Sequence, residues 1–182
     1  MTTDFQNTKL DKAFGHLDVD GNGVVEHADV LALGSRLFAG FGEAPTSAKG
    51  QDVLNGLETF WQSLLSATDL DGDRQISPHE WRTGMADAFI HDRAGFDAGL
   101  RPAAEAVMRL ADTDGDGTLG LDEFHTLQRA FGTPSEQVAE SFARMDTDGD
   151  GALSVDELVA ATRQYYTGAD ENAHGNWFFG RP

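Results

Sequence analysis

Hydrophobic residues recur at intervals of three and four positions along most of the chain, a spacing typical of amphipathic α-helices. Leu10, Phe14 and Leu17, for example, fall on one helical face. The pattern occurs in eight stretches, each of which is predicted to be a helix: residues 10–17, 30–38, 54–65, 81–90, 104–111, 124–131, 138–145 and 158–165. The chain is therefore expected to be all-α.

Turn-forming residues separate some of these helices. Residues 40–51, GFGEAPTSAKGQ, are predicted to connect the second helix to the third. Residues 91–100 are predicted to continue the fourth helix and then to link the two halves of the chain.

Capping signals mark some helix starts. Residues 133–136, TPSE, have the spacing of a capping box with proline in the first helical position, so a helix is predicted to start there. Ser77 with Glu80, and Ser154 with Glu157, have the same spacing.

Acidic twelve-residue segments lie between the paired helical stretches, and the clearest is DTDGDGTLGLDE, residues 112–123. Oxygen-bearing side chains occupy its first, third and fifth places. A cation of calcium's size binds six to eight oxygens, so the loop must turn sharply for alternate residues to converge on it. Gly117 at the sixth place permits that turn, the carbonyl of Thr118 adds an oxygen, and Glu123 supplies two. This is the spacing of an EF-hand loop.

The same register recurs in residues 18–29, 69–80 and 146–157, and such repetition makes coincidence a poor explanation. Four helix-loop-helix units in two pairs are therefore predicted. The predicted metal ligands are Asp18, Asp20, Asn22, Val24, Glu26 and Asp29 in site 1; Asp69, Asp71, Asp73, Gln75 and Glu80 in site 2; Asp112, Asp114, Asp116, Thr118 and Glu123 in site 3; and Asp146, Asp148, Asp150, Ala152 and Glu157 in site 4.

The four sites are not equivalent. Sites 3 and 4 are complete, with a water expected beside Gly120 at the ninth place of site 3. Site 1 ends in Asp29, which is one methylene shorter than glutamate, so a six-coordinate shell that tolerates magnesium is expected there. Glu26 is expected to compensate directly or through water.

Site 2 is expected to be the weakest, because Arg74 occupies the glycine place. A positive φ strains a non-glycine residue by about 1 kcal/mol or more, and the guanidinium adds charge beside the metal. Either a weakly occupied or an empty site fits this loop. Three to four calcium ions are therefore expected in all, with magnesium as an alternative, especially at site 1.

The charge of the chain follows from these loops. The formal net charge is −18, and of 31 acidic residues 16 stand at ligand places, which leaves 15 to balance 13 lysines and arginines. Such a chain is expected to avoid nucleic acid and anionic membranes. Without cations the clusters repel themselves, so the metal-free protein is expected to be less stable.

Other functional classes find little support. There is no cysteine, which excludes disulfides and thiolate metal sites. There is no signal peptide, membrane-length apolar run or glycine after Met1, so a soluble cytoplasmic protein is expected. The protein is also expected to be a monomer. Gly115, Gly117 and Gly120 form a literal GxGxxG, but the surrounding aspartates would repel a pyrophosphate. The six histidines lack zinc spacing, and no catalytic set is found, so the protein is not expected to be an enzyme.

The C-terminal segment is rich in aromatic residues: Tyr165, Tyr166, Trp177, Phe178 and Phe179. A solvated tail seldom carries so much apolar area, so it is expected to fold back into a cavity or groove. The alternative is a disordered end that binds a partner. The predicted organisation is an EF-hand pair in residues 1–92, a second pair in 93–168 and the aromatic tail in 169–182.

With four loops in place, the chain resembles the sarcoplasmic calcium-binding protein family, including its bacterial calerythrin branch. Nearly the whole chain supports this resemblance: its length, four hands, a long first interval, a shorter last one, and the ending HGNWFFG of residues 174–180. The resemblance implies two EF-hand pairs in one compact globule and a role in calcium buffering or transport.

Three functions are compatible with the residues. A buffer is favoured because there are only 4 methionines, whereas sensors use methionines in adaptable grooves, and because 12 phenylalanines suggest a filled core. A sensor is possible if calcium or a protein target displaces the tail. The third is a ligand carrier similar to the coelenterazine photoproteins, with His174, Trp177 and Tyr165 as candidate contacts, although the local order differs from their C-terminal pattern.

Overall fold

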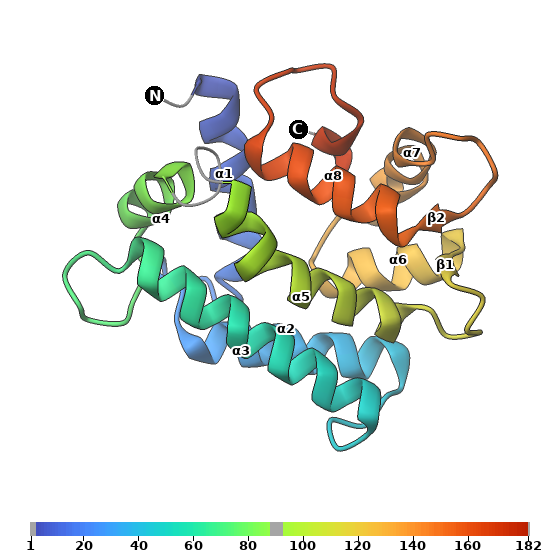
Figure 1. Cartoon of the computed structure of the whole chain (residues 1–182), viewed down its shortest axis with the longest axis horizontal. Helices are drawn as coiled ribbons and strands as arrows, with labels where there is room; N and C mark the ends of the chain where they lie inside the picture. The colour runs from blue at the N-terminus through green and yellow to red at the C-terminus, as the bar shows by residue number, and fades with distance from the viewer. Residues whose placement is uncertain (1–2, 88–92, 182) are drawn as a thin grey trace.

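The computed structural model describes residues 3–87 and 93–181, and its helical fold confirms the predicted all-α class (Figure 1). Its helices pair around the four acidic loops as predicted. The elements are α1 (Asp4–Leu17), α2 (His27–Phe41), α3 (Ala48–Thr68), α4 (Pro78–Met85), α5 (Arg93–Ala111), β1 (Thr118–Leu119), α6 (Leu121–Ala130), α7 (Ser135–Met145), β2 (Leu153–Ser154), α8 (Val155–Thr167) and the 3-10 helix η2 (His174–Trp177).

Two helix starts follow the predicted capping boxes. The Ser77 hydroxyl accepts from the Glu80 N–H while the Glu80 carboxylate accepts from the Ser77 N–H, and Ser154 and Glu157 do the same at α8. Each exchange satisfies two N–H groups that the first helical turn leaves unpaired. The same glutamates therefore end the loops and start the exit helices.

The capping box predicted at residues 133–136 is wrong. Helix α7 begins at Ser135 with Pro134 as its N-cap, so proline is not in the first helical position. The Thr133 hydroxyl instead donates to the Gln128 side-chain oxygen at 2.6 Å, inside the protein. The Thr133 N–H also donates to the Gln128 carbonyl at 3.0 Å, so Thr133 belongs to the C-terminal end of α6 rather than to the start of α7.

Two connections also differ from prediction. The link between the first two units is shorter than residues 40–51, because α3 already begins at Ala48, where the Ser47 hydroxyl accepts from the Gly50 N–H. Residues 93–100 belong to α5 rather than to a linker. Phe89, Ile90 and the predicted boundary at residue 92 lie outside the described residues.

The loops pair across short antiparallel contacts. Val25 and Ile76, the eighth residues of loops 1 and 2, exchange two main-chain hydrogen bonds of 2.9 Å. In the second pair Leu119 is opposite Leu153 in the β1–β2 ladder. All four side chains are buried, so each contact joins two metal loops to one apolar core.

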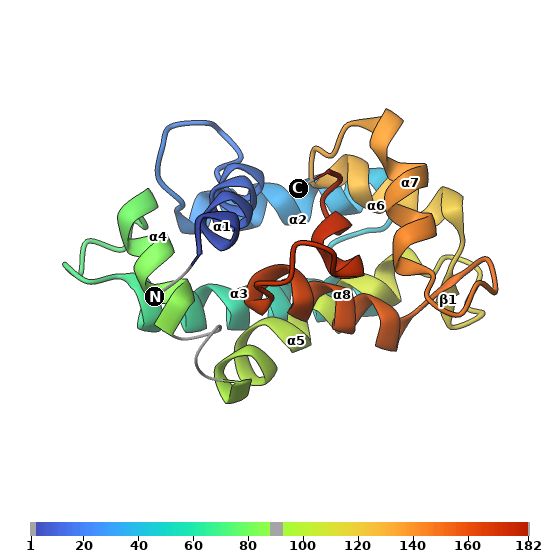
Figure 2. The ribbon, with the colours of Figure 1, turned by 90° about the horizontal axis from the view of Figure 1, so that it is seen from above.

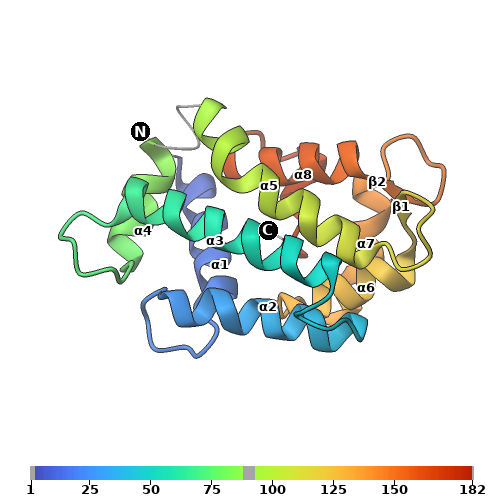
Figure 3. The same cartoon turned by 60° about the horizontal axis from the view of Figure 1, so that its bottom comes forward.

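The two EF-hand pairs share that core, because their buried hydrophobic residues form one continuous cluster. Helices α3 and α5 lie side by side in antiparallel directions (Figure 3). Gly56 permits their close approach, since a Cβ there would lie 3.0 Å from the Ala103 Cα.

The C-terminal segment turns back from α8 and runs between α1 and α7 (Figure 2). Phe178 and Phe179 are buried, and Phe179 packs on the rings of Tyr165 and His16. The Gln128 amide donates to the Phe178 carbonyl at 2.8 Å, which fixes the segment to α6.

Candidate metal centre

Each of the four predicted loops gathers carboxylates within a few ångströms. In each loop, three carboxylates each offer an oxygen within 4.8 Å of the other two. The groups are Asp18, Asp20 and Asp29; Asp69, Asp71 and Asp73; Asp112, Asp114 and Glu123; and Asp146, Asp148 and Glu157. Side chains so close repel one another unless a cation or hydrogen-bond donors compensate.

The first carboxylate of each loop is oriented by the amide at the sixth place. The Gly117 N–H donates to the Asp112 Oδ2 at 3.1 Å, and Gly151 donates to Asp146 at 3.0 Å. Gly117 has a φ of 89°, and this left-handed conformation directs its N–H into the loop. The same contact occurs in loop 1 at 2.9 Å and in loop 2 at 3.1 Å.

The twelfth carboxylate bridges the two ends of its loop. Glu123 accepts from the Thr113 N–H at 2.7 Å through Oε1 and from the Gly120 N–H at 3.0 Å through Oε2. Burial of Glu157 by itself raises its pKa, but donors on Ser154 and Thr147 outweigh it and lower the pKa to about 2. Burial likewise raises the pKa of Glu123, and donors on Thr113 and Gly120 outweigh it and lower the pKa. Glu123 and Glu157 are therefore ionised at neutral pH, as metal ligands must be.

Two predicted place-5 ligands lie outside the tight groups. Asp116 accepts from the Thr118 N–H at 2.8 Å, and Asp150 accepts from the Ala152 N–H at 2.9 Å. Asp73 belongs to its group but makes the same contact with Gln75. In loop 1 the Val24 N–H donates to the Asn22 Oδ1. Thus the backbone of each predicted carbonyl ligand is held by the side chain two residues earlier.

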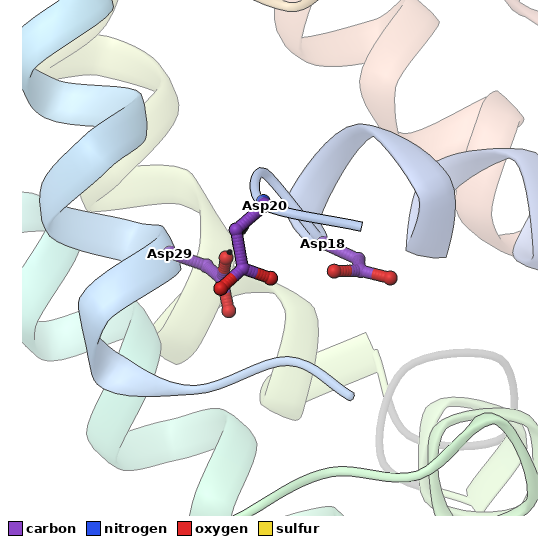
Figure 4. A group of neighbouring side chains, drawn as sticks. All are labelled: Asp18, Asp20 and Asp29. Carbon is purple, nitrogen blue, oxygen red and sulfur yellow. Dashed lines mark hydrogen bonds between the residues drawn. The ribbon is translucent and has the colours of Figure 1, made fainter. Parts of the chain in front are cut away.

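Site 1 closes through Asp29 despite its shorter side chain. Asp29 is buried and accepts from the Val19 and Asp20 N–H groups with Oδ1 and from the Glu26 N–H with Oδ2. Asp20 lies next to Asp29, and Asp18 lies across from them near the end of α1, with an oxygen of each within 4.8 Å of the others (Figure 4). Glu26 serves as the N-cap residue of α2.

Site 2 contains the conformational anomaly that its sequence predicts. Arg74 has a φ of 63°, and no other non-glycine residue in the described part of the chain has a positive φ. Glu80 lies outside the Asp69 group and accepts from the Leu70 N–H and from Ser77. Loop 2 therefore has the same left-handed turn at its sixth place as the other loops, but here the turn strains the backbone of Arg74.

Two cations that the sequence reasoning did not single out contact these loops. Lys49 donates to the Asp112 carbonyl at 2.7 Å, and Arg36 donates to the Val19 carbonyl at 3.2 Å. No sequence pattern marks either residue, because each lies outside the loop that it contacts.

An apolar cavity of about 80 Å³ lies between the two EF-hand pairs. Leu33 and Leu57 line it from the first pair, Met108 and Val159 from the second, and Phe178 from the tail. The aromatic tail therefore forms part of its wall.

None of the described helices combines the length and apolar character required to cross a lipid bilayer.

Comparison with known proteins gives a consistent result. The EF-hand domain pair family matches residues 101–163. Calerythrin from Saccharopolyspora erythraea is 30% identical over 143 residues, covering 78% of this chain and 81% of that protein. The sarcoplasmic calcium-binding protein of Scylla paramamosain is 24% identical, covering 70% and 68%. A solved Streptomyces coelicolor calcium-binding protein superposes with a TM-score of 0.82 at 33% identity, over 91% of this chain and 99% of that one.

Proposed function

Because this chain belongs to the family of calcium-binding EF-hand proteins that includes calerythrin and the sarcoplasmic calcium-binding proteins, we propose that it is an intracellular calcium buffer. In this role the protein takes up and releases calcium without presenting a new surface to a target.

The observation that carries the proposal is the closure of the apolar core. A sensor EF-hand opens on calcium and exposes a groove rich in methionine. Here Met85, Met108 and Met145 are all buried, and Phe178 and Phe179 of the tail fill space between the helices. A core closed by its own chain leaves little apolar surface for a target.

The proposed stoichiometry is three or four calcium ions per chain. Sites 3 and 4 have the full set of predicted ligands and bind most tightly. Site 1 binds calcium with less discrimination against magnesium, because Asp29 is shorter than the usual glutamate. Site 2 is the weakest, because Arg74 brings strain and positive charge.

The test is the fluorescence of a dye that reports exposed hydrophobic surface, recorded in magnesium buffer before and after calcium is added. A buffer gives a fall, because a looser calcium-free protein becomes closed. A large rise on calcium would overturn the proposal and favour a sensor.

A calcium sensor is the second candidate. The S. coelicolor relative is described in connection with calcium-mediated regulation. In a sensor, calcium would displace the segment of Phe178 and Phe179 from its contacts with α6 and α8 and expose that surface to a protein target.

A carrier of a small apolar ligand is the third candidate, and the cavity is the feature in its favour. Its volume of about 80 Å³ is smaller than the roughly 150 Å³ of an engineered cavity that binds benzene, so it is too small for a multi-ring chromophore such as coelenterazine. Light emission on calcium addition after incubation with coelenterazine would support the carrier over the buffer.

A further inference from the structure

Lys49, in the first EF-hand pair, contacts the opening residue of site 3 in the second. Its Nζ donates to the Asp112 main-chain oxygen at 2.7 Å. Lys49 is the second residue of α3 and is half-buried. An ammonium group from one EF-hand pair therefore lies at the first ligand residue of the other.

The packing of α3 on α5 fixes this contact. The two helices run antiparallel (Figure 3). Positions 49, 52 and 56 of α3 therefore lie opposite positions 112, 109 and 103. Asp52 is 3.9 Å from Arg109 along this seam, and Gly56 lets the backbones approach. The start of α3 is held by the Ser47 cap, one residue before the turn that carries Lys49. The packing of the two helices therefore fixes the position of the Lys49 ammonium, which does not move freely as it would on an open surface.

Its charge acts differently on the empty and filled loop. In the empty loop, the oxygens of Asp112, Asp114 and Glu123 lie within 4.8 Å of one another, and a neighbouring ammonium reduces their repulsion. When a divalent cation enters, the same ammonium repels it. Both effects favour the empty loop.

We propose that Lys49 sets the calcium affinity of site 3 from the other EF-hand pair, by stabilising the calcium-free loop and opposing the cation. The proposal rests on the assignment of the site 3 ligands within the proposed function. Because coupling is reciprocal, calcium at site 3 also weakens the Lys49–Asp112 contact and changes the α3–α5 seam.

The test compares Lys49→Met, which keeps the apolar stem without the charge, with Lys49→Arg, which keeps the charge. Arg129→Met is the matched control, because it removes one positive charge from the exposed side of α6. Calcium titrations are followed by NMR at the amides of Gly117 and Gly23. Each donates to the first carboxylate of its loop, so each reports its own site.

The expected result is that Lys49→Met lowers by about threefold the calcium concentration that half-fills site 3 at low salt, and that added salt reduces this difference. Lys49→Arg and Arg129→Met stay close to the parent, and Gly23 changes little in all variants. Unchanged or weaker binding at Gly117 in Lys49→Met, or an equal change at Gly23, would overturn the proposal.

The parent protein separates this proposal from the assignment on which it rests. If the Gly117 amide of the parent does not respond to calcium, the site 3 assignment itself fails. If it responds in the parent but is unaffected by Lys49→Met, only the role of Lys49 is overturned. Circular dichroism of each variant checks that the helices are retained.

Discussion

The ammonium of Lys9 lies 2.8 Å from the side-chain oxygen of Asn176 and connects the first helix to the C-terminal segment. Lys9 also donates to the carbonyls of Gln164 and Gly168, at the end of α8. Helix C-termini leave carbonyls unpaired and favour cations, so this buried lysine both caps α8 and holds the tail. Asn176 in turn donates to the Asp170 carbonyl.

Replacing Lys9 by methionine is expected to loosen the tail. The variant removes the ammonium from the carbonyls of Gln164 and Gly168 and from the Asn176 side chain, and only Gln164 keeps another donor, the Gly168 N–H. The free energy of unfolding should therefore fall by about 2 kcal/mol. Urea denaturation measures this change, and limited proteolysis detects release of the tail. Lys12→Met is the control, because Lys12 makes an exposed contact with the Arg181 carbonyl and should cost less than about 0.5 kcal/mol. Equal losses in both variants would contradict the special role of Lys9.

Lys9 should also make the free energy of unfolding depend on pH in the alkaline range. Burial lowers the pKa of Lys9 from 10.5 to about 8 in the folded protein. Between these values the unfolded chain binds more protons, so the contribution of Lys9 to stability rises with pH, by at most about 1.4 kcal/mol per pH unit. This pH-dependent part, which adds to the contribution of the hydrogen bonds, is complete above about pH 10.5 and is lost as pH falls through about 8. The unfolding free energy of the parent relative to Lys9→Met should therefore increase from pH 8 to 10. A flat difference would contradict this pKa.

Arg74→Gly should strengthen site 2. The substitution relieves about 1 kcal/mol of backbone strain and removes a positive charge beside the metal, so calcium should bind roughly tenfold more tightly there. Calorimetry should show one more ion or a tighter weakest ion. Arg74→Ala removes only the charge and should give a smaller gain. If the alanine and glycine variants bind equally, strain is not limiting.

Asp29→Glu should increase the preference of site 1 for calcium over magnesium. A longer side chain can bind a large cation through two oxygens, whereas magnesium requires a smaller octahedral shell. Titration of the Gly23 amide with calcium in excess magnesium measures the change. The added methylene must fit where Asp29 is 3% exposed, so circular dichroism should check the fold. An unchanged preference would show that Glu26 or the loop backbone sets selectivity.

Glu123→Gln should remove one tightly bound calcium and leave the ions at the other sites. A neutral amide cannot supply the charged, two-oxygen closure of the loop. Calorimetry measures the stoichiometry, and Glu136→Gln, on the exposed side of α7, controls for loss of one charge. Unchanged stoichiometry and affinity would contradict the role of Glu123.

Removal of calcium from the parent should lower its melting temperature. A ligand that binds only the folded state stabilises it in proportion to the logarithm of its concentration over the dissociation constant. The carboxylate groups also repel one another when calcium is removed. A calcium chelator should therefore reduce the melting temperature measured by circular dichroism, and added calcium should restore it.

The positions of the loops and most helices were predictable, because their signals are local. A metal loop needs twelve consecutive residues and the Ser77–Glu80 cap needs four, so each can be recognised from a short continuous stretch of sequence. The cap predicted at Thr133 is wrong because a second local signal competes for this residue: its N–H and its hydroxyl both bond to Gln128 at the end of α6, five residues earlier. The start of α3 was placed too late because turn-forming residues continue into its first turn.

The sequence by itself determined the four candidate calcium loops, the helical class and the strained position of Arg74, since each depends on spacing or on one residue's allowed backbone angles. Only the tertiary structure decided that Lys9 meets Asn176 and that Lys49 meets Asp112. These partners are 167 and 63 residues apart. Such contacts follow from how helices pack around a shared apolar core, and no local periodicity records which polar side chains that packing brings together.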